Sequence, residues 1–182
     1  MREVSEAVPT MLRPLALLLC LSASPALAAE LAGSLKLGVG MGIAPDRDDS
    51  LLLSAGARVQ LGATFGPGHA VFAVGRLHPL ADPGLEAVDL GYLVGAAYER
   101  RFALYEQWRP TLGFTLGIGG TNRCEGNVCN EGGPAAALEL GVQRMLGRSV
   151  HLSLSAELLT QVNTGVIEGT MLLPMLWAGL DL

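Results

Sequence analysis

The chain has 182 residues, a formal net charge of −5 and a mean hydropathy of +0.41. Half of its residues are hydrophobic and 16% are charged, against about 25% in soluble domains, which excludes a disordered chain. Its pI of about 5.1 argues against a nucleic-acid partner, since such proteins carry a basic surface.

Residues 11–28 have the pattern of a secretory signal peptide. Arg13 precedes the apolar run Leu15–Leu21, and Ala26-Leu27-Ala28 supplies small residues at a cleavage site. The apolar run is too short to cross a membrane as an anchor. We therefore expect residues 1–28 to be removed by cleavage after Ala28.

Cleavage at this point leaves one domain, residues 29–182. Met11 is a candidate for the true start, because residues 1–10 fit no leader pattern. No segment after residue 28 offers about 18 uninterrupted apolar residues, so no transmembrane helix is predicted. The hydrophobic side chains of such an apolar exported chain must therefore be kept from water by some other structure.

Apolar and small or polar residues alternate along most of the mature chain, which is the period of a β-strand. In residues 33–43, for example, Leu35 and Leu37 alternate with Ser, Lys and Gly. The alternation is least clear in the third segment, where Arg76 shares a face with Phe72. The pattern predicts about eight strands, at residues 33–43, 51–65, 70–78, 87–99, 109–119, 135–145, 150–159 and 170–182.

The predicted connections alternate in length. Tight turns at residues 66–69 and 146–149, and a middling one after residue 99, alternate with longer polar loops. The longer loops are predicted at 44–50, 79–86, 120–133 and 160–169. Bacterial membrane barrels show such an asymmetry, with short periplasmic turns and longer external loops.

The two sets of connections also differ in composition. The longer loops are acidic, with Asp46, Asp48, Asp49, Asp82, Glu86, Glu125, Glu131 and Glu168 against Arg47 and Arg123. The other end collects arginines and aromatic residues, namely Arg100, Arg101, Arg109, Arg144 and Arg148 with Phe65, Tyr98, Phe102, Tyr105 and Trp108. Aromatic residues gather in this way where a barrel meets the membrane interface.

With its leader, alternating strands and alternating connections, the chain resembles the small eight-stranded outer-membrane barrels of the outer-membrane-protein-A and opacity type. The resemblance covers residues 29–182. It implies an all-β, antiparallel, up-and-down transmembrane barrel in the outer membrane of a diderm bacterium. It also implies contact with outer-membrane lipid, and we expect a monomer.

Two features depart from that family. The chain ends in Leu182 rather than in an aromatic residue, and Pro174 lies inside the last predicted strand, where a bulge would accommodate it. The alternative fold is a soluble exported β-sandwich or a lipocalin-like binding barrel. A soluble protein would need many more Lys and Glu residues on its outer face.

The strand parity places charged side chains of both signs on the inner face of the predicted barrel. They are Lys36, Arg58, Arg76, Asp89, Glu99, Glu139, Glu157 and Asp181. An eight-stranded barrel is just wide enough for side chains to fill it. We therefore predict a packed polar core of paired charges, and the alternative is a charged path for ions or solutes.

Cys124 and Cys129 lie in the fifth predicted connection. In an exported protein two such cysteines predict a disulfide, which would stabilise the loop by roughly 2 kcal/mol. A metal site is disfavoured because no His lies near them in the sequence. The sequence indicates no metal and no cofactor.

His151, Ser153 and Glu157 share one face of the seventh predicted strand. The His-x-Ser pair resembles that of the lipid A deacylase family, in which His would act as base and Ser as nucleophile. Leu154 and Ser155 replace the Asn and the small residue that follow in that family, and the parity points the pair into the lumen. We therefore expect no enzymatic activity but a structural or surface-interaction role, with a possible ligand at the acidic loops.

Overall fold

The computed structural model consists of β-strands joined by turns. It describes residues 29–43, 51–66, 68–82, 87–103, 105, 107–122, 124–125, 128–129, 131–147, 150–164 and 169–182. The strands are β1 (Glu30–Ile43), β2 (Leu51–Phe65), β3 (His69–Asp82), β4 (Ala87–Arg101), β5 (Trp108–Thr121), β6 (Cys124–Glu125), β7 (Val128–Cys129), β8 (Glu131–Met145), β9 (His151–Thr164) and β10 (Gly169–Asp181).

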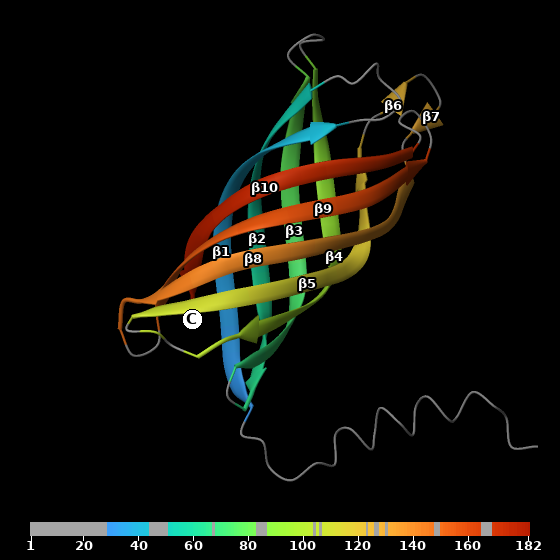
Figure 1. Cartoon of the computed structure of the whole chain (residues 1–182). Coiled ribbons are helices and arrows are strands. Elements are labelled where there is room, and N and C mark those ends of the chain that lie inside the picture. The colour runs from blue at the N-terminus through green and yellow to red at the C-terminus, as the bar shows by residue number, and fades with distance from the viewer. Residues whose placement is uncertain are drawn as a thin grey trace, which may run out of the picture.

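Eight of these strands close into a barrel in the order β1-β10-β9-β8-β5-β4-β3-β2 (Figure 1). Every neighbouring pair is antiparallel, and β1 pairs with β10 from Ser34–Asp181 to Ile43–Leu172. The two short strands β6 and β7 form a separate hairpin beyond one end of the barrel. The predicted all-β, eight-stranded, up-and-down barrel is confirmed.

The described residues contain no helix with the length and the hydropathy needed to span a membrane.

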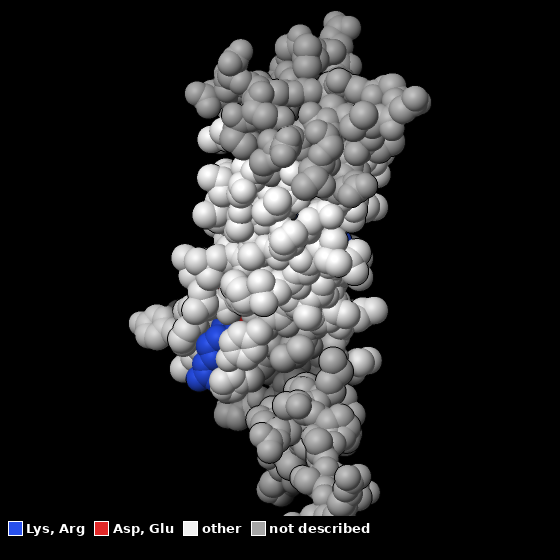
Figure 2. Space-filling model, turned by 90° about the vertical axis from the view of Figure 1, so that its right-hand side faces the viewer, with Lys and Arg blue, Asp and Glu red and all other residues white. Residues whose placement is uncertain are grey.

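The outer wall of the barrel is apolar and the inner face is largely polar. Most leucine, valine and isoleucine side chains of the strands point outward, with Leu37 66% exposed and Ile118 62% exposed. Figure 2 shows a wall almost without charged residues between the two ends. A wall of this kind is stable against lipid, whereas a soluble barrel would turn the same residues inward. The lipocalin-like alternative is therefore wrong.

The two ends of the barrel differ, and we name them by their connections. At the turn end β2 leads to β3, β4 to β5 and β8 to β9, and the C-terminus lies there; at the loop end β1 leads to β2, β3 to β4, β5 to β8 and β9 to β10. The predicted loops at 79–86 and 160–169 are shorter than expected, because β3 continues to Asp82 and β9 to Thr164. The asymmetry in loop length is thus weaker than the sequence predicted.

Pro174 causes no bulge, which corrects the prediction. β10 pairs with β1 at Gly40–Met175 and at Ile43–Leu172 in the same register, without pairs between them. The proline has no N–H to donate, so the ladder is interrupted locally while its ring lies on the exposed outer wall. The register shift that the described strands do contain lies in β8, between Gly132 and Ala135.

Candidate functional site: the lumen of the barrel

Like charges stand side by side on two parts of the inner wall. Lys36 on β1 is the register partner of Arg58 on β2, which is in turn the partner of Arg76 on β3. On β8 and β9, Glu139 is the register partner of Glu157. Like charges directly opposite each other repel, so neither row is stable without the other. We call these five residues the charged rows.

The charged rows neutralise each other across the lumen. Glu139 Oε1 accepts hydrogen bonds from Lys36 Nζ at 3.0 Å and from Arg58 Nη2 at 2.7 Å. Arg58 Nη1 donates to Glu157 Oε2 at 2.6 Å, and Arg76 Nη1 donates to Glu157 Oε1. In the order of the barrel, β2 and β3 lie opposite β8 and β9. These ion pairs therefore bridge opposite walls.

Trp177 on β10 lies within this network and is fully buried. The guanidinium carbons of Arg58 and Arg76 each lie 4.9 Å from the centre of its ring, within the range of cation–π attraction. Its Nε1 donates to Glu157 Oε1 at 3.2 Å. The indole thus fills the lumen at the level where the charges meet.

Glycines on the inner face provide the room for these large side chains. A Cβ atom on Gly38 would lie 2.5 Å from Trp177 Cε3, and one on Gly179 would lie 2.7 Å from Lys36 Cγ. Neither position could hold a larger residue without displacing its neighbour. The Gly residues in the alternating pattern are therefore part of the packing.

A second polar group lies toward the turn end. Gln143 Nε2 donates to Asp181 Oδ2 at 2.9 Å and to Glu99 Oε1 at 3.2 Å, and Arg101 Nε donates to Glu99 Oε1 at 2.6 Å. All four side chains have inward parity. The sequence analysis predicted Glu99 and Asp181 as members of the polar core but did not include Gln143. The inward parity of Gln143 on its strand could have identified it.

Toward the loop end, polar side chains in the lumen lie among buried apolar ones such as Leu80, Leu159 and Leu173. Asp89 on β4 is half-buried there and takes no part in the charged rows. His78, Gln161 and Asn163 are almost fully buried, and Gln161 Nε2 donates to Asn163 Oδ1 at 3.2 Å. The sequence analysis predicted that Gln161 and Asn163 belong to a loop. Two polar residues near the end of a strand have the composition of a loop even when they face the lumen.

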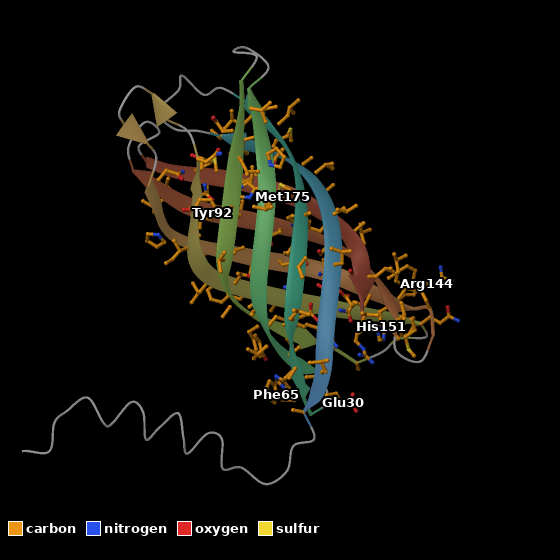
Figure 3. The ribbon with its side chains drawn as sticks, turned by 180° about the vertical axis from the view of Figure 1, so that it is seen from behind. Glu30, Phe65, Tyr92, Arg144, His151 and Met175 are labelled. Carbon is orange, nitrogen blue, oxygen red and sulfur yellow. The ribbon has the colours of Figure 1, made fainter. Side chains whose placement is uncertain are left out.

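The candidate catalytic residues do not form a triad. Ser153 is 2% exposed and faces the lumen, away from lipid. Glu157 is engaged by Arg58, Arg76 and Trp177 rather than by a histidine. His151 lies at the turn end, where Figure 3 labels it, and it lines a cavity of about 710 Å³ at the mouth of the barrel.

Several predicted features fall wholly or partly outside the described residues. These are the signal peptide at residues 1–28, the loop carboxylates, Arg47, Arg123, Arg148 and the side chains of both cysteines. The backbone of the hairpin pairs Cys124 with Cys129 in register. Among the described residues, no cluster of His, Cys, Asp and Glu could hold a metal ion.

A closed eight-stranded barrel with an apolar outer wall and a filled, partly polar lumen is the fold of the small outer-membrane β-barrels. A solved structure shares this fold. The chain is similar to Neisserial surface protein A (NspA), with a TM-score of 0.69 and 12% sequence identity over 85% of this chain and 98% of that one. At this identity the similarity shows the fold.

Two looser similarities involve barrels of the same kind. Ail, the attachment invasion locus protein of Yersinia pestis, has a TM-score of 0.48 and 15% identity, covering 84% of this chain and 99% of that one. The N-terminal β-barrel domain of Pseudomonas aeruginosa OprF has a TM-score of 0.44 and 14% identity, covering 82% and 97%. No protein-family model and no curated protein matches the sequence.

Proposed function

We propose that the protein is a non-enzymatic outer-membrane barrel, which keeps its lumen closed and acts through the loops at its loop end. The observation that carries this proposal is the bridge of ion pairs between opposite walls, with Trp177 among them. An ion crossing the barrel would have to break several charge-assisted hydrogen bonds between buried side chains. The charged rows thus serve as a structural core.

The loop end would then be the surface that meets other molecules. Its sequence is acidic, so the partner that it fits is a cationic ligand or surface. A Cys124–Cys129 disulfide would fix the hairpin of β6 and β7, because the two residues are register partners. We propose that residues 1–28 are cleaved during export and that the barrel is a monomer in the outer membrane.

Conductance in planar lipid bilayers tests the closed lumen. We expect the wild-type barrel to give no steady ohmic current. The double variant Arg58→Ala/Trp177→Ala removes a bridging cation and the largest buried ring, and we expect it to conduct. This variant is the positive control, because its current shows that the assay detects an open lumen. Steady wild-type current would contradict the proposal.

The absence of enzymatic activity is tested at Ser153. We expect Ser153→Ala to leave the acylation of lipid A unchanged in cells that produce the protein, because Ser153 faces the lumen. Mass spectrometry of extracted lipid A measures this directly. A change that depends on Ser153 would establish the enzyme instead.

A further inference from the structure

Among the described side chains of the outer wall, the charged ones lie near one end. They are two arginines, Arg100 on β4 and Arg144 on β8. Both lie near the turn end, among the last residues of β4 and β8. The face in Figure 2 is largely white, with a blue patch near its lower end. A cation at a lipid-facing position is costly unless it lies at the membrane interface and finds an anionic partner.

Arg144 is held in a stacked position. It is the register partner of Trp108, and its guanidinium carbon lies 5.4 Å from the centre of the Trp108 ring. The side chain is exposed and forms no ion pair with the described residues. A guanidinium that stacks through its face still offers the N–H groups of its edge, which match the two oxygens of a phosphate. In Figure 3 Arg144 lies at the outer edge of the turn end.

Arg100 repeats this arrangement on the neighbouring hairpin. Its guanidinium carbon lies 5.9 Å from the centre of the Phe102 ring, and its Nη1 contacts His69 Nε2. His69 Nδ1 in turn lies 2.7 Å from the Tyr98 hydroxyl. Arg100 is thus positioned by contacts within the wall.

Both arginines lie on strands that pair with β5, where Arg100 is the register partner of Leu112 and Arg144 is the register partner of Trp108. The backbone N–H of Phe102 donates to Pro110 O at 3.0 Å, two residues along β5 from Trp108, and Tyr105 pairs with Trp108. We call this surface the turn-end belt. It consists of Arg100, Phe102, Tyr105, Trp108 and Arg144.

We propose that the turn-end belt binds the headgroup phosphate of an anionic phospholipid in the leaflet that it faces. Arg144 would contact the phosphate oxygens through the edge of its guanidinium, and Arg100 would add positive charge to the same membrane interface. The aromatic rings would contact the glycerol and the first part of the acyl chains, where aromatic belts of membrane proteins lie. The proposal depends on the membrane placement of the barrel and is independent of whether the lumen conducts.

Native mass spectrometry of the full-length protein purified from outer membranes tests this site. The delipidated protein in detergent is offered equal amounts of phosphatidylglycerol and phosphatidylethanolamine. We expect the wild type to retain phosphatidylglycerol preferentially, and Arg144→Gln to weaken that binding about fivefold, the effect of about one basic residue at a membrane surface. The double variant Arg100→Gln/Arg144→Gln is expected to lose the preference.

Arg109→Gln is the matched control. Arg109 lies at the same end but has inward parity, as the register partner of the buried Gln143, so its loss changes the net charge equally and leaves the belt intact. We expect this variant to keep the preference, and a mobility shift on heating shows that each variant is folded. Equal binding of the two lipids by the wild type, or an equal loss in Arg109→Gln and Arg144→Gln, would overturn the proposal.

Discussion

At the residue scale, the barrel depends on charges that their own neighbours cannot neutralise. Lys36, Arg58 and Arg76 stand in one row across three adjacent strands, and their counter-charges come from the opposite wall. Parity along each strand predicts that these side chains face inward. The strand register, which sequence periodicity does not reveal, decides which of them meet.

Glu157→Gln tests this dependence. The change leaves two buried arginines with one carboxylate fewer, and we expect the free energy of unfolding to fall by about 3–5 kcal/mol. Urea unfolding in lipid vesicles, followed by tryptophan fluorescence, measures the change. Glu30→Gln is the control, because Glu30 is exposed at the turn end and should shift stability by less than about 0.5 kcal/mol. Equal effects of the two variants would contradict the account.

Gly38→Ala tests the packing around Trp177. The added Cβ would lie 2.5 Å from the ring and 2.8 Å from the carbonyl oxygen of Leu176, so we expect a loss of about 1–3 kcal/mol. Gly75→Ala is the matched control on the outer face, where an added Cβ meets nothing within 4 Å. The same unfolding assay applies. Equal stability of the two variants would show that the side chains around Trp177 are not closely packed.

At the element scale, the sequence identified every barrel strand but misjudged several ends. Pro79 suggested the end of the third strand, yet its ring lies on the outer wall and β3 continues past it to Asp82. Gln161 and Asn163 suggested a loop, yet both are buried in the lumen. Polarity indicates a loop only where the side chain faces water, and a membrane barrel turns polar residues inward.

The hairpin of β6 and β7 gives a prediction at the same scale. We expect Cys124 and Cys129 to resist alkylation in the oxidised, denatured protein and to react fully after reduction. Mass spectrometry of the peptide that contains both residues measures the labelling. Replacing both by Ser should make the loop between Thr121 and Glu131 more sensitive to protease. Two free thiols in protein isolated from outer membranes would refute the disulfide.

At the scale of the whole molecule, the barrel reverses the usual distribution of side chains. Leucine and valine dominate the outer surface, while buried arginine, glutamate and glutamine side chains share the centre with an apolar cluster that includes Leu80, Leu159 and Leu173. This reversal was predictable from alternation combined with the scarcity of charged residues on the apolar face. The sequence also indicated the eight inner-face charges, but not the two facing rows or the position of Trp177 between them, because both arise from long-range register.

Heat modifiability of the protein in isolated outer membranes tests the central claim most directly. Boiled and unboiled samples are compared on a detergent gel, because a closed membrane barrel stays folded in detergent until it is heated. The account predicts that the protein is found in the outer-membrane fraction and that its mobility changes on boiling. Recovery in the soluble periplasmic fraction without a mobility shift would contradict the assignment of the apolar face to lipid.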